Sequence, residues 1–277
     1  MCNGDGAAAF VPGHVTGFFS VHRADEARRT GSRGAGVALA DGVTTEVAPS
    51  EETTVRLNGD PVDVGSVTRV LDALDVTASV SATTGLPLGS GFGVSGAMAL
   101  GTALAANAVF DRGRSENDLV GVAHAAEVRA GTGLGDVVAQ ARGGVPVRVE
   151  PGSPGVGALD GVPASGRIEY VSFGELSTSE VIGGGTGALD DAGERALRAL
   201  RETPTLPAFM EASRRFAREA DLLDGEVAEA VDAVVDAGGE AAMAMLGRSV
   251  FALDTGLSDA GYDPEVAAVD ATGARLR

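Results

Sequence analysis

A glycine-rich turn between a predicted strand and a predicted helix constrains the fold of this chain more than any other segment. Residues 86–107 read LPLGSGFGVSGAMALGTALAAN, with glycines and serines ahead of a run of small apolar residues. The preceding stretch 76–83 alternates apolar and polar side chains, which predicts a half-buried strand, and residues 93–110 predict a helix. Backbone N–H groups at a helix N-terminus bind anions, and glycine allows a ligand to approach closely. The segment therefore predicts a phosphate-binding turn.

Three other interpretations of this turn have different requirements. A Walker-type phosphate loop needs a lysine, and the sequence contains none. A dinucleotide-binding fingerprint matches Gly91-x-Gly93-x-x-Gly96, but it belongs in the first strand–helix unit, with an acidic residue at a strand end about 20 positions further on. Here the turn lies well inside the chain, and Glu116, which falls near that distance, stands at the start of the next predicted helix. A turn used only for packing stays open, although Ser90 and Ser95 would then more often be alanine.

Two carboxylates after the turn have the spacing and type that phosphoryl transfer needs. Glu127 lies on a predicted helix over 115–130 that starts with Ser115 as N-cap, and Asp136 follows the glycine-rich stretch GTGLG. One carboxylate can hold Mg²⁺ while the other accepts the proton of an acceptor hydroxyl. Taken singly, Glu127 is better explained by a solvated helix face and Asp136 by a helix N-cap.

A histidine near the start of the chain is a further candidate. Residues 7–11 predict a short strand that ends at Pro12–Gly13, and His14 then stands at the edge of the sheet. A lone histidine is more often structural than catalytic, so this residue gains meaning only from what lies around it.

The remaining pattern predicts strands in the first half of the chain and helices in the second. Residues 150–166 hold three prolines and five glycines and form the strongest signal for a domain boundary. The other expected elements are strands at 36–47, 53–57 and 167–173, a helix at 66–75 capped by Ser66, a helical or extended segment at 137–140, helices at 189–202, 206–223 and 225–237, a strand pair at 241–246 and 249–254, and a last helix near 256–268.

Composition excludes several classes of partner. The net charge is −18, and every basic residue is arginine, so nucleic acid and anionic membranes are not expected as partners. An acidic excess without lysine is typical of a cytosolic protein from a high-salt cell, although G+C-rich codons also favour arginine. The single cysteine, Cys2, allows no intramolecular disulfide. The first residues lack a signal-peptide pattern, and no apolar run is long enough for a membrane span, so we expect a cytoplasmic protein.

Taken in chain order, three segments resemble the N-terminal landmarks of the GHMP kinase superfamily. VPGHV at 11–15 resembles its opening A-P-G-K-V, and residues 87–97 resemble its phosphate motif P-x-G-S-G-L-G-S-S-A, with valine at Val94 where the family has the first serine of the pair. The run EVRAGTGLGD resembles the stretch from the metal-binding glutamate to the catalytic aspartate. Together with GSRGAG, these segments look most like the archaeal pantoate kinases. The third family motif is weak, because AMAMLGRSVFAL at 242–253 contains only Gly247.

The resemblance implies an α+β fold of two domains of GHMP-kinase type. Residues 1–155 would form the N-terminal ATP-binding domain and residues 156–277 the C-terminal domain, with ATP and substrate between them. It further implies that the chain phosphorylates the primary hydroxyl of pantoate in coenzyme A biosynthesis, with Mg²⁺ and as a homodimer. Another small alcohol, such as homoserine or a mevalonate-like acid, and a non-catalytic ligand-binding protein stay open as alternatives.

Roles for individual residues follow from the resemblance. Ser95 and Glu127 would hold Mg²⁺, and Asp136 would orient or deprotonate the acceptor hydroxyl. His14 stands where mevalonate-kinase-like members have a lysine, so we expect it to contact the substrate. The residues that would surround the ATP phosphates are Pro87, Gly89, Ser90, Gly91, Phe92, Gly93, Ser95 and Gly96.

The carboxylate of pantoate needs a cation, and arginine is the only strong base in this chain. Arg33, which stands between glycines in GSRGAG, is the first candidate, and Arg129 is the second. An exposed surface arginine is the alternative explanation for each.

Overall fold

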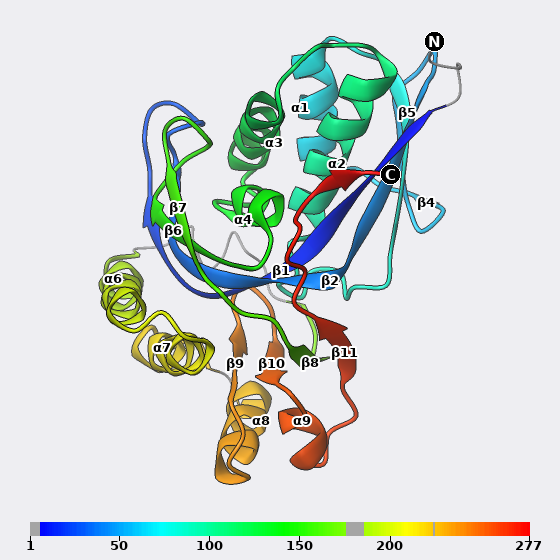
Figure 1. Cartoon of the computed structure of the whole chain (residues 1–277). Helices are drawn as coiled ribbons and strands as arrows, with labels where there is room; N and C mark the ends of the chain where they lie inside the picture. The colour runs from blue at the N-terminus through cyan, green and yellow to red at the C-terminus, as the bar shows by residue number, and fades with distance from the viewer. Residues whose placement is uncertain (1–5, 176–185, 224) are drawn as a thin grey trace.

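The computed structural model describes residues 6–175, 186–223 and 225–277, which form two β-sheets with helices packed on each. The first sheet has the order β12-β1-β2-β5-β3-β4, and β6 and β7 extend it from β2. In Figure 1 this sheet and its helices fill the upper half of the molecule, and the second sheet with its helices lies below. The elements of the upper part are β1 Ala7–His22, β2 Gly31–Pro49, β3 Thr54–Leu57, β4 Asp60–Pro61, α1 Gly65–Leu74, β5 Ala78–Thr84, α2 Val94–Val109, α3 Glu116–Ala130, α4 Asp136–Arg142, β6 Val145–Glu150, β7 Ala158–Val162 and β12 Arg275–Leu276.

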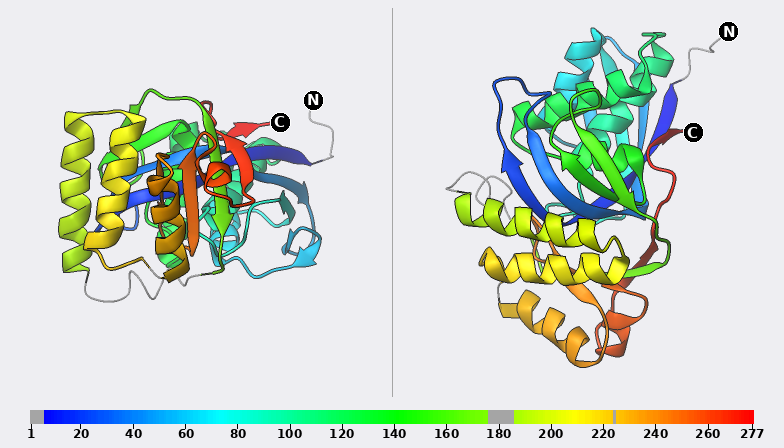
Figure 2. Two further views of the ribbon diagram at one scale, coloured as in Figure 1. Left: turned by 90° about the horizontal axis from the view of Figure 1, so that it is seen from below. Right: turned by 60° about the vertical axis from the view of Figure 1, so that its left-hand side comes forward.

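The second sheet has the order β11-β8-β10-β9, and all its pairs are antiparallel. Helices α6 and α7 lie beneath the long curved strands β1 and β2, as Figure 2 shows, and aromatic rings such as Phe19 and Phe216, 5.7 Å apart, join the two parts. The elements of this lower part are β8 Arg167–Ser172, α6 Gly187–Glu202, α7 Leu206–Glu219, α8 Gly225–Asp236, β9 Ala241–Ala244, β10 Ser249–Leu253, α9 Gly256–Asp259 and β11 Glu265–Ala268. The predicted α+β fold is confirmed.

Strand β1 is longer than its sequence pattern predicts. It continues through Pro12 and Gly13 to His22, and its register against β2 shifts between these two residues. The predicted strand end at Pro12–Gly13 is therefore wrong, because the Pro-Gly pair produces a β-bulge and the pairing resumes after it. His14 consequently lies inside the sheet, fully buried, and not at its edge.

The helices of the upper part pack on one face of the first sheet through small and branched apolar side chains. Ala78, Val80 and Ala82 of β5 are fully buried, which confirms the predicted alternation, although the strand starts at Ala78. Ser115 caps α3 as predicted by accepting a hydrogen bond from the backbone N–H of Asp118. The predicted cap of α1 is wrong, because Val64 holds the N-cap position and Ser66 lies buried in the first turn.

In the lower part the three predicted helices and the predicted strand pair are present as α6, α7, α8 and β9–β10. The predicted helix near 256–268 is wrong beyond its first turn. Helix α9 ends at Asp259, Gly261 follows with a φ of +89°, and Pro264 prevents the helix from continuing. The chain then forms β11 instead.

The stretch 150–166 is not a free linker, because β7 pairs antiparallel with β6 and so belongs to the first sheet. The chain crosses to the second sheet after Val162, and β12 returns to pair with β1. The division at residues 155 and 156 stays a prediction, and this pairing favours a crossing point several residues later. Cys2 lies outside the described residues. None of the helices described here is long and apolar enough to cross a bilayer.

Candidate functional site

The glycine-rich turn opens directly onto the N-terminus of α2. Gly89, Gly91 and Gly93 have φ values of +65°, +88° and +66°, a region of backbone conformation that favours glycine. Gly93 is the N-cap of α2 and has no side chain to satisfy the first N–H groups of the helix, which leaves these donors available to a ligand. The sequence prediction of a turn that presents backbone N–H groups at a helix N-terminus therefore matches the geometry.

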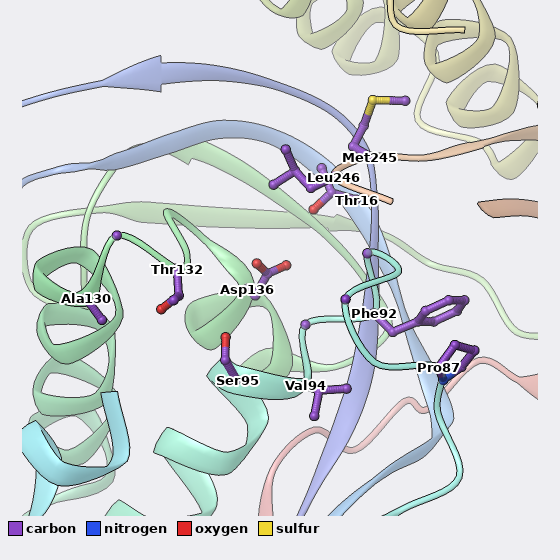
Figure 3. A pocket seen from close by; sticks show the side chains of 14 residues that line it. Thr16, Pro87, Phe92, Val94, Ser95, Ala130, Thr132, Asp136, Met245 and Leu246 are labelled. Carbon is purple, nitrogen blue, oxygen red and sulfur yellow. The ribbon is translucent and has the colours of Figure 1, made fainter. Parts of the chain in front are cut away.

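A cavity of about 410 Å³ lies over this turn. Ser95, Thr132 and Asp136 lie around the same space, between the turn and the end of α3, as Figure 3 shows. The hairpin residues Met245 and Leu246 close the cavity from the second sheet, so both halves of the chain contribute to it. The complete lining consists of Thr16, Pro87, Gly89, Gly91, Phe92, Gly93, Val94, Ser95, Ala130, Gly131, Thr132, Asp136, Met245 and Leu246.

Ser95 and Glu127 form one half of the polar site. The Ser95 hydroxyl donates a hydrogen bond of 3.0 Å to Glu127 Oε2, and Glu127 is only 2% exposed. The other carboxylate oxygen, Oε1, is buried without a hydrogen-bond partner among the described residues. Burial raises the pKa of Glu127, with only partial compensation from nearby hydroxyls. This carboxylate therefore lacks the positive charge that would balance it.

Asp136 and His14 form the other half. Asp136 is the first residue of α4, and His14 Nδ1 lies 2.7 Å from its Oδ1. Burial lowers the pKa of His14, so at neutral pH the imidazole is uncharged and donates its Nδ1 hydrogen to the carboxylate. Burial alone would raise the pKa of Asp136, but the hydrogen bond from His14 and the charge of Arg148 lower it below its ordinary value. Asp136 is therefore an ionised carboxylate at neutral pH.

Arg148 is a functional candidate that sequence reasoning missed. It lies on β6, is 2% exposed, and donates from Nε to the Ser32 hydroxyl at 3.2 Å, while its Nη1 is buried without a hydrogen-bond partner among the described residues. A small cavity of about 20 Å³ is lined by both Arg148 and Asp136. Gly135 makes room for the guanidinium, since a Cβ there would lie 2.6 Å from Arg148 Nε. The one signal in the sequence is an arginine inside the apolar strand VPVRV.

Two contacts hold the glycine turn from opposite sides. Gln140, one turn after Asp136 on α4, donates from Nε2 to the Gly93 carbonyl at 2.9 Å. From the second sheet, the Ser249 hydroxyl donates to the Ser90 carbonyl at 2.9 Å. Gly247 lies so close to this carbonyl that a Cβ would be 2.0 Å from it. The single glycine of the weak third motif therefore serves the close approach of the hairpin to the turn.

The predicted phosphate-contact residues mostly line the cavity, with two exceptions. Gly96 lies buried in the first turn of α2, and the Ser90 hydroxyl donates to the carbonyls of Leu88 and Gly174. Val94 lines the cavity at the position where the family has a serine, and it is the first residue of α2. The turn thus offers backbone groups and a single cavity-facing hydroxyl, that of Ser95.

The two predicted substrate arginines lie elsewhere. Arg33 on β2 donates to the Val149 carbonyl at 2.7 Å and pairs with Glu194 Oε2 of α6 at 3.0 Å. Arg129, in the last turn of α3, lines a different cavity between α3, α1 and the β1–β2 turn. Neither residue lines the two cavities beside Asp136.

The donor set at Ser95 and Glu127 fits a magnesium ion. Mg²⁺ prefers hard oxygen ligands and keeps several waters while it binds one or two protein groups. The unpartnered Oε1 of Glu127 and the Ser95 hydroxyl offer such oxygens next to the phosphate turn. Across the described ranges, no group of three or more His, Cys, Asp or Glu side chains is arranged to hold a metal by itself.

This combination of fold and site defines a class of small-molecule kinase, and sequence comparison agrees. Residues 64–144, from the start of α1 to the end of α4, match the description "GHMP kinases N terminal domain". The chain therefore belongs to the GHMP kinase superfamily.

Within this superfamily the chain is similar over most of its length to pantoate kinases. It is 37% identical over 265 residues to the pantoate kinase of Thermococcus kodakarensis, a match that covers 88% of this chain and 86% of the relative. The pantoate kinase of Methanocaldococcus jannaschii is 31% identical over 255 residues, covering 88% and 91%. A solved structure described as a phosphotransferase related to the CoA biosynthesis pathway superimposes with a TM-score of 0.87 at 31% identity, covering 98% of each chain.

Proposed function

We propose that this chain is an ATP-dependent pantoate kinase, which phosphorylates the primary hydroxyl of pantoate to 4-phosphopantoate for coenzyme A biosynthesis. The observation that carries the proposal is the ionised Asp136 facing the glycine turn across one cavity, with Glu127 beside it. The similarity to pantoate kinases over 88% of the chain selects the acceptor.

In the proposed reaction, the backbone N–H groups of the glycine turn bind the phosphates of ATP, and Ser95 with Glu127 would hold Mg²⁺. That ion would supply positive charge to the transferring phosphoryl group. Asp136 orients the acceptor hydroxyl and takes its proton as the oxygen forms a bond to the γ-phosphorus, and the bond from that phosphorus to the β–γ bridging oxygen breaks. His14 keeps the carboxylate oriented by its hydrogen bond, so no lysine is needed beside Asp136.

We further propose that Arg148 binds the carboxylate of pantoate. Its Nη1 is a buried donor without a partner in the described chain, it lies beside Asp136, and a carboxylate would satisfy it with a charge-assisted hydrogen bond. Arg33, which already pairs with Glu194, and Arg129, which lines the other cavity, are weaker candidates for this role.

A panel of acceptors tests the proposal. ADP formation is measured with ATP, Mg²⁺ and pantoate, homoserine or mevalonate in turn, and we expect turnover with pantoate far above the others. Preferred turnover of homoserine or mevalonate would contradict the acceptor and keep the kinase. A protein that consumes no ATP with any acceptor is a ligand-binding member of the fold. NAD binding in a fluorescence titration would support the dinucleotide-binding interpretation of the glycine turn.

The setting of the enzyme is part of the proposal. A net charge of −18 with no lysine favours a cytoplasmic enzyme of an archaeal cell with high internal salt. Turnover on pantoate is therefore expected to rise from low to molar salt. We also propose a homodimer, which sedimentation at the same salt concentrations tests, and two domains that meet near residue 155.

A further inference from the structure

We propose that a second cavity, between the β1–β2 turn and helices α1 and α3, binds a small phosphorylated molecule. Its volume is about 730 Å³, within the range of roughly 300–1,000 Å³ that small-molecule sites occupy. It shares no lining residue with the cavity over the glycine turn. Four of its lining residues are arginines from three segments that are far apart in the sequence: Arg28, Arg69, Arg114 and Arg129.

None of these four guanidinium groups forms an ion pair within the described ranges. Elsewhere, most surface arginines pair with a carboxylate, as in Arg195 with Glu219 at 2.8 Å or Arg218 with Asp232 at 2.7 Å. The lining, with four arginines and three carboxylates, carries a small net positive formal charge in a protein whose overall net charge is −18.

Three carboxylates, Asp25, Glu26 and Asp118, share the lining, and none of them forms an ion pair with these four arginines within the described ranges. Glu26 pairs with Arg29, outside the lining, at 3.5 Å. Asp118 accepts a hydrogen bond of 3.0 Å from the Ser115 hydroxyl, as part of the cap of α3. An anionic ligand would therefore find donors that the protein itself leaves open.

The floor of the cavity is apolar and made of small side chains. Ala73 of α1 and Val122, Ala125 and Ala126 of α3 line it, so the two helices leave a groove and do not fill it. Gly121 allows the Arg28 guanidinium to lie against α3, since a Cβ there would be 3.0 Å from its Nη1. The ligand class that fits is a molecule with phosphate groups at the arginines and an apolar portion on the helix floor.

The donors that are present suit an anion with several charged oxygens, such as a phosphorylated molecule. Arginine offers five N–H donors in a planar fork, which matches phosphate and carboxylate geometry, and several arginines together suit a ligand with several charged oxygens. A concave cavity of this volume favours a small molecule over a protein surface as its ligand.

Calorimetric titration of the full chain with inorganic pyrophosphate tests the proposal, in the presence of saturating AMP-PNP so that the glycine turn is filled. We expect saturable binding, weakened at least about tenfold in the double variant Arg28→Gln/Arg114→Gln. The matched control is Arg198→Gln/Arg201→Gln, which removes the same charge from the exposed face of α6 and should bind like the wild type. Thermal unfolding checks that both variants fold.

The outcomes separate cleanly. Absence of saturable binding, or equal loss in both double variants, overturns the site, because the second result shows only a general charge effect. Citrate that binds as well as pyrophosphate overturns the preference for phosphate. Turnover on pantoate is measured separately. If the proposed kinase function fails, the pyrophosphate titration still tests whether this cavity binds phosphate.

Discussion

Glu127 and Asp136 are two carboxylates at the edges of one site, one buried and one partly exposed, and their surroundings shift their pKa values in opposite directions. Glu127 is 2% exposed and its hydrogen-bonding neighbours are hydroxyls, so burial, together with the negative charge of Asp136, raises its pKa. The Asp136 side chain is 19% exposed and has an imidazole donor and a nearby guanidinium, which together lower its pKa. The same functional group is thus held in two different electrostatic states.

This difference in pKa shift indicates a separate chemical role for each carboxylate. A carboxylate that is buried without a cation is stabilised by any positive ion that reaches it, which suits a metal ligand. A carboxylate whose charge is already compensated stays ionised and can accept a proton from a bound hydroxyl. Variants that alter one carboxylate at a time therefore distinguish the metal ligand from the proton acceptor.

Asp136→Asn should have the largest effect. The amide keeps the shape and can still accept a hydrogen bond from His14, but it cannot take the proton of the acceptor. We expect kcat to fall by roughly 10²–10⁴-fold, the usual contribution of a general base. Binding of AMP-PNP, measured by calorimetry, should stay near the wild-type value, and turnover close to wild type would contradict the role of Asp136.

Glu127→Gln should reduce turnover next most strongly, by about 10²-fold, because a metal ion supplies several kcal/mol of transition-state stabilisation. The reduction should shrink as the Mg²⁺ concentration rises, which separates a metal ligand from a proton acceptor.

The same variant should make the metal-free protein more stable. A carboxyl group with a raised pKa in the folded state costs stability above that pKa, and a neutral amide removes the cost. We expect a higher Tm for Glu127→Gln than for wild type at pH 7 without metal, and no such gain at a pH below the ordinary value of a glutamate. A lower Tm at pH 7 would mean that the wild-type carboxylate already has a compensating charge.

Arg148→Met tests the charge that sets the state of Asp136. Loss of a charge-assisted hydrogen bond to the pantoate carboxylate costs about 1.5–3 kcal/mol, so kcat/KM for pantoate should fall roughly 10–100-fold while the KM for ATP changes little. Arg33→Met is the matched control on the neighbouring strand, and it should lower the Tm through loss of its pair with Glu194 with a smaller effect on kcat/KM.

The pH dependence of Arg148→Met has a defined sign. Arg148 lowers the pKa of Asp136, so the acid limb of the pH–rate profile should move to higher pH in the variant. In stability, the ionised Asp136 contributes above its unfolded pKa and loses that contribution as pH falls through its lower folded pKa. In the variant, the difference between the unfolded and folded pKa values of Asp136 should therefore be smaller. An unchanged acid limb would show that His14 alone sets the charge state of Asp136.

The parts of this site that the sequence predicts are the local ones. The glycine turn and α2 are continuous in the chain, and Glu127 and Asp136 are joined by one short segment, so spacing alone indicates their proximity. Ser95 and Glu127 lie on two helices that are consecutive in the sequence, and their hydrogen bond joins these helices. The family resemblance, rather than spacing, indicated that the two side chains act together.

The parts that sequence reasoning missed depend on pairings between distant strands and helices. Arg148 reaches the site because β6 pairs with β2, with Gly34 opposite Arg148. Arg33, next to that glycine, points instead to Glu194 of α6, far along the chain. Adjacent strand residues face opposite sides of a sheet, so the choice between these two arginines depended on register, which no local pattern reveals.

Gln140→Met should have the smallest effect and tests whether the two carboxylate states depend on the turn that lies between them. Gln140 is fully buried and its Nε2 donates to the Gly93 carbonyl, so methionine preserves volume but leaves that carbonyl without this donor. A lost hydrogen bond of this kind costs about 1 kcal/mol, so the KM for ATP should rise roughly fivefold with little change in the KM for pantoate. The acid limb of the pH–rate profile should stay in place, because Gln140 contacts the turn and not Asp136. A shift of that limb would show instead that α4 moves as a unit, and that the state of Asp136 depends on how its helix is held against the glycine turn.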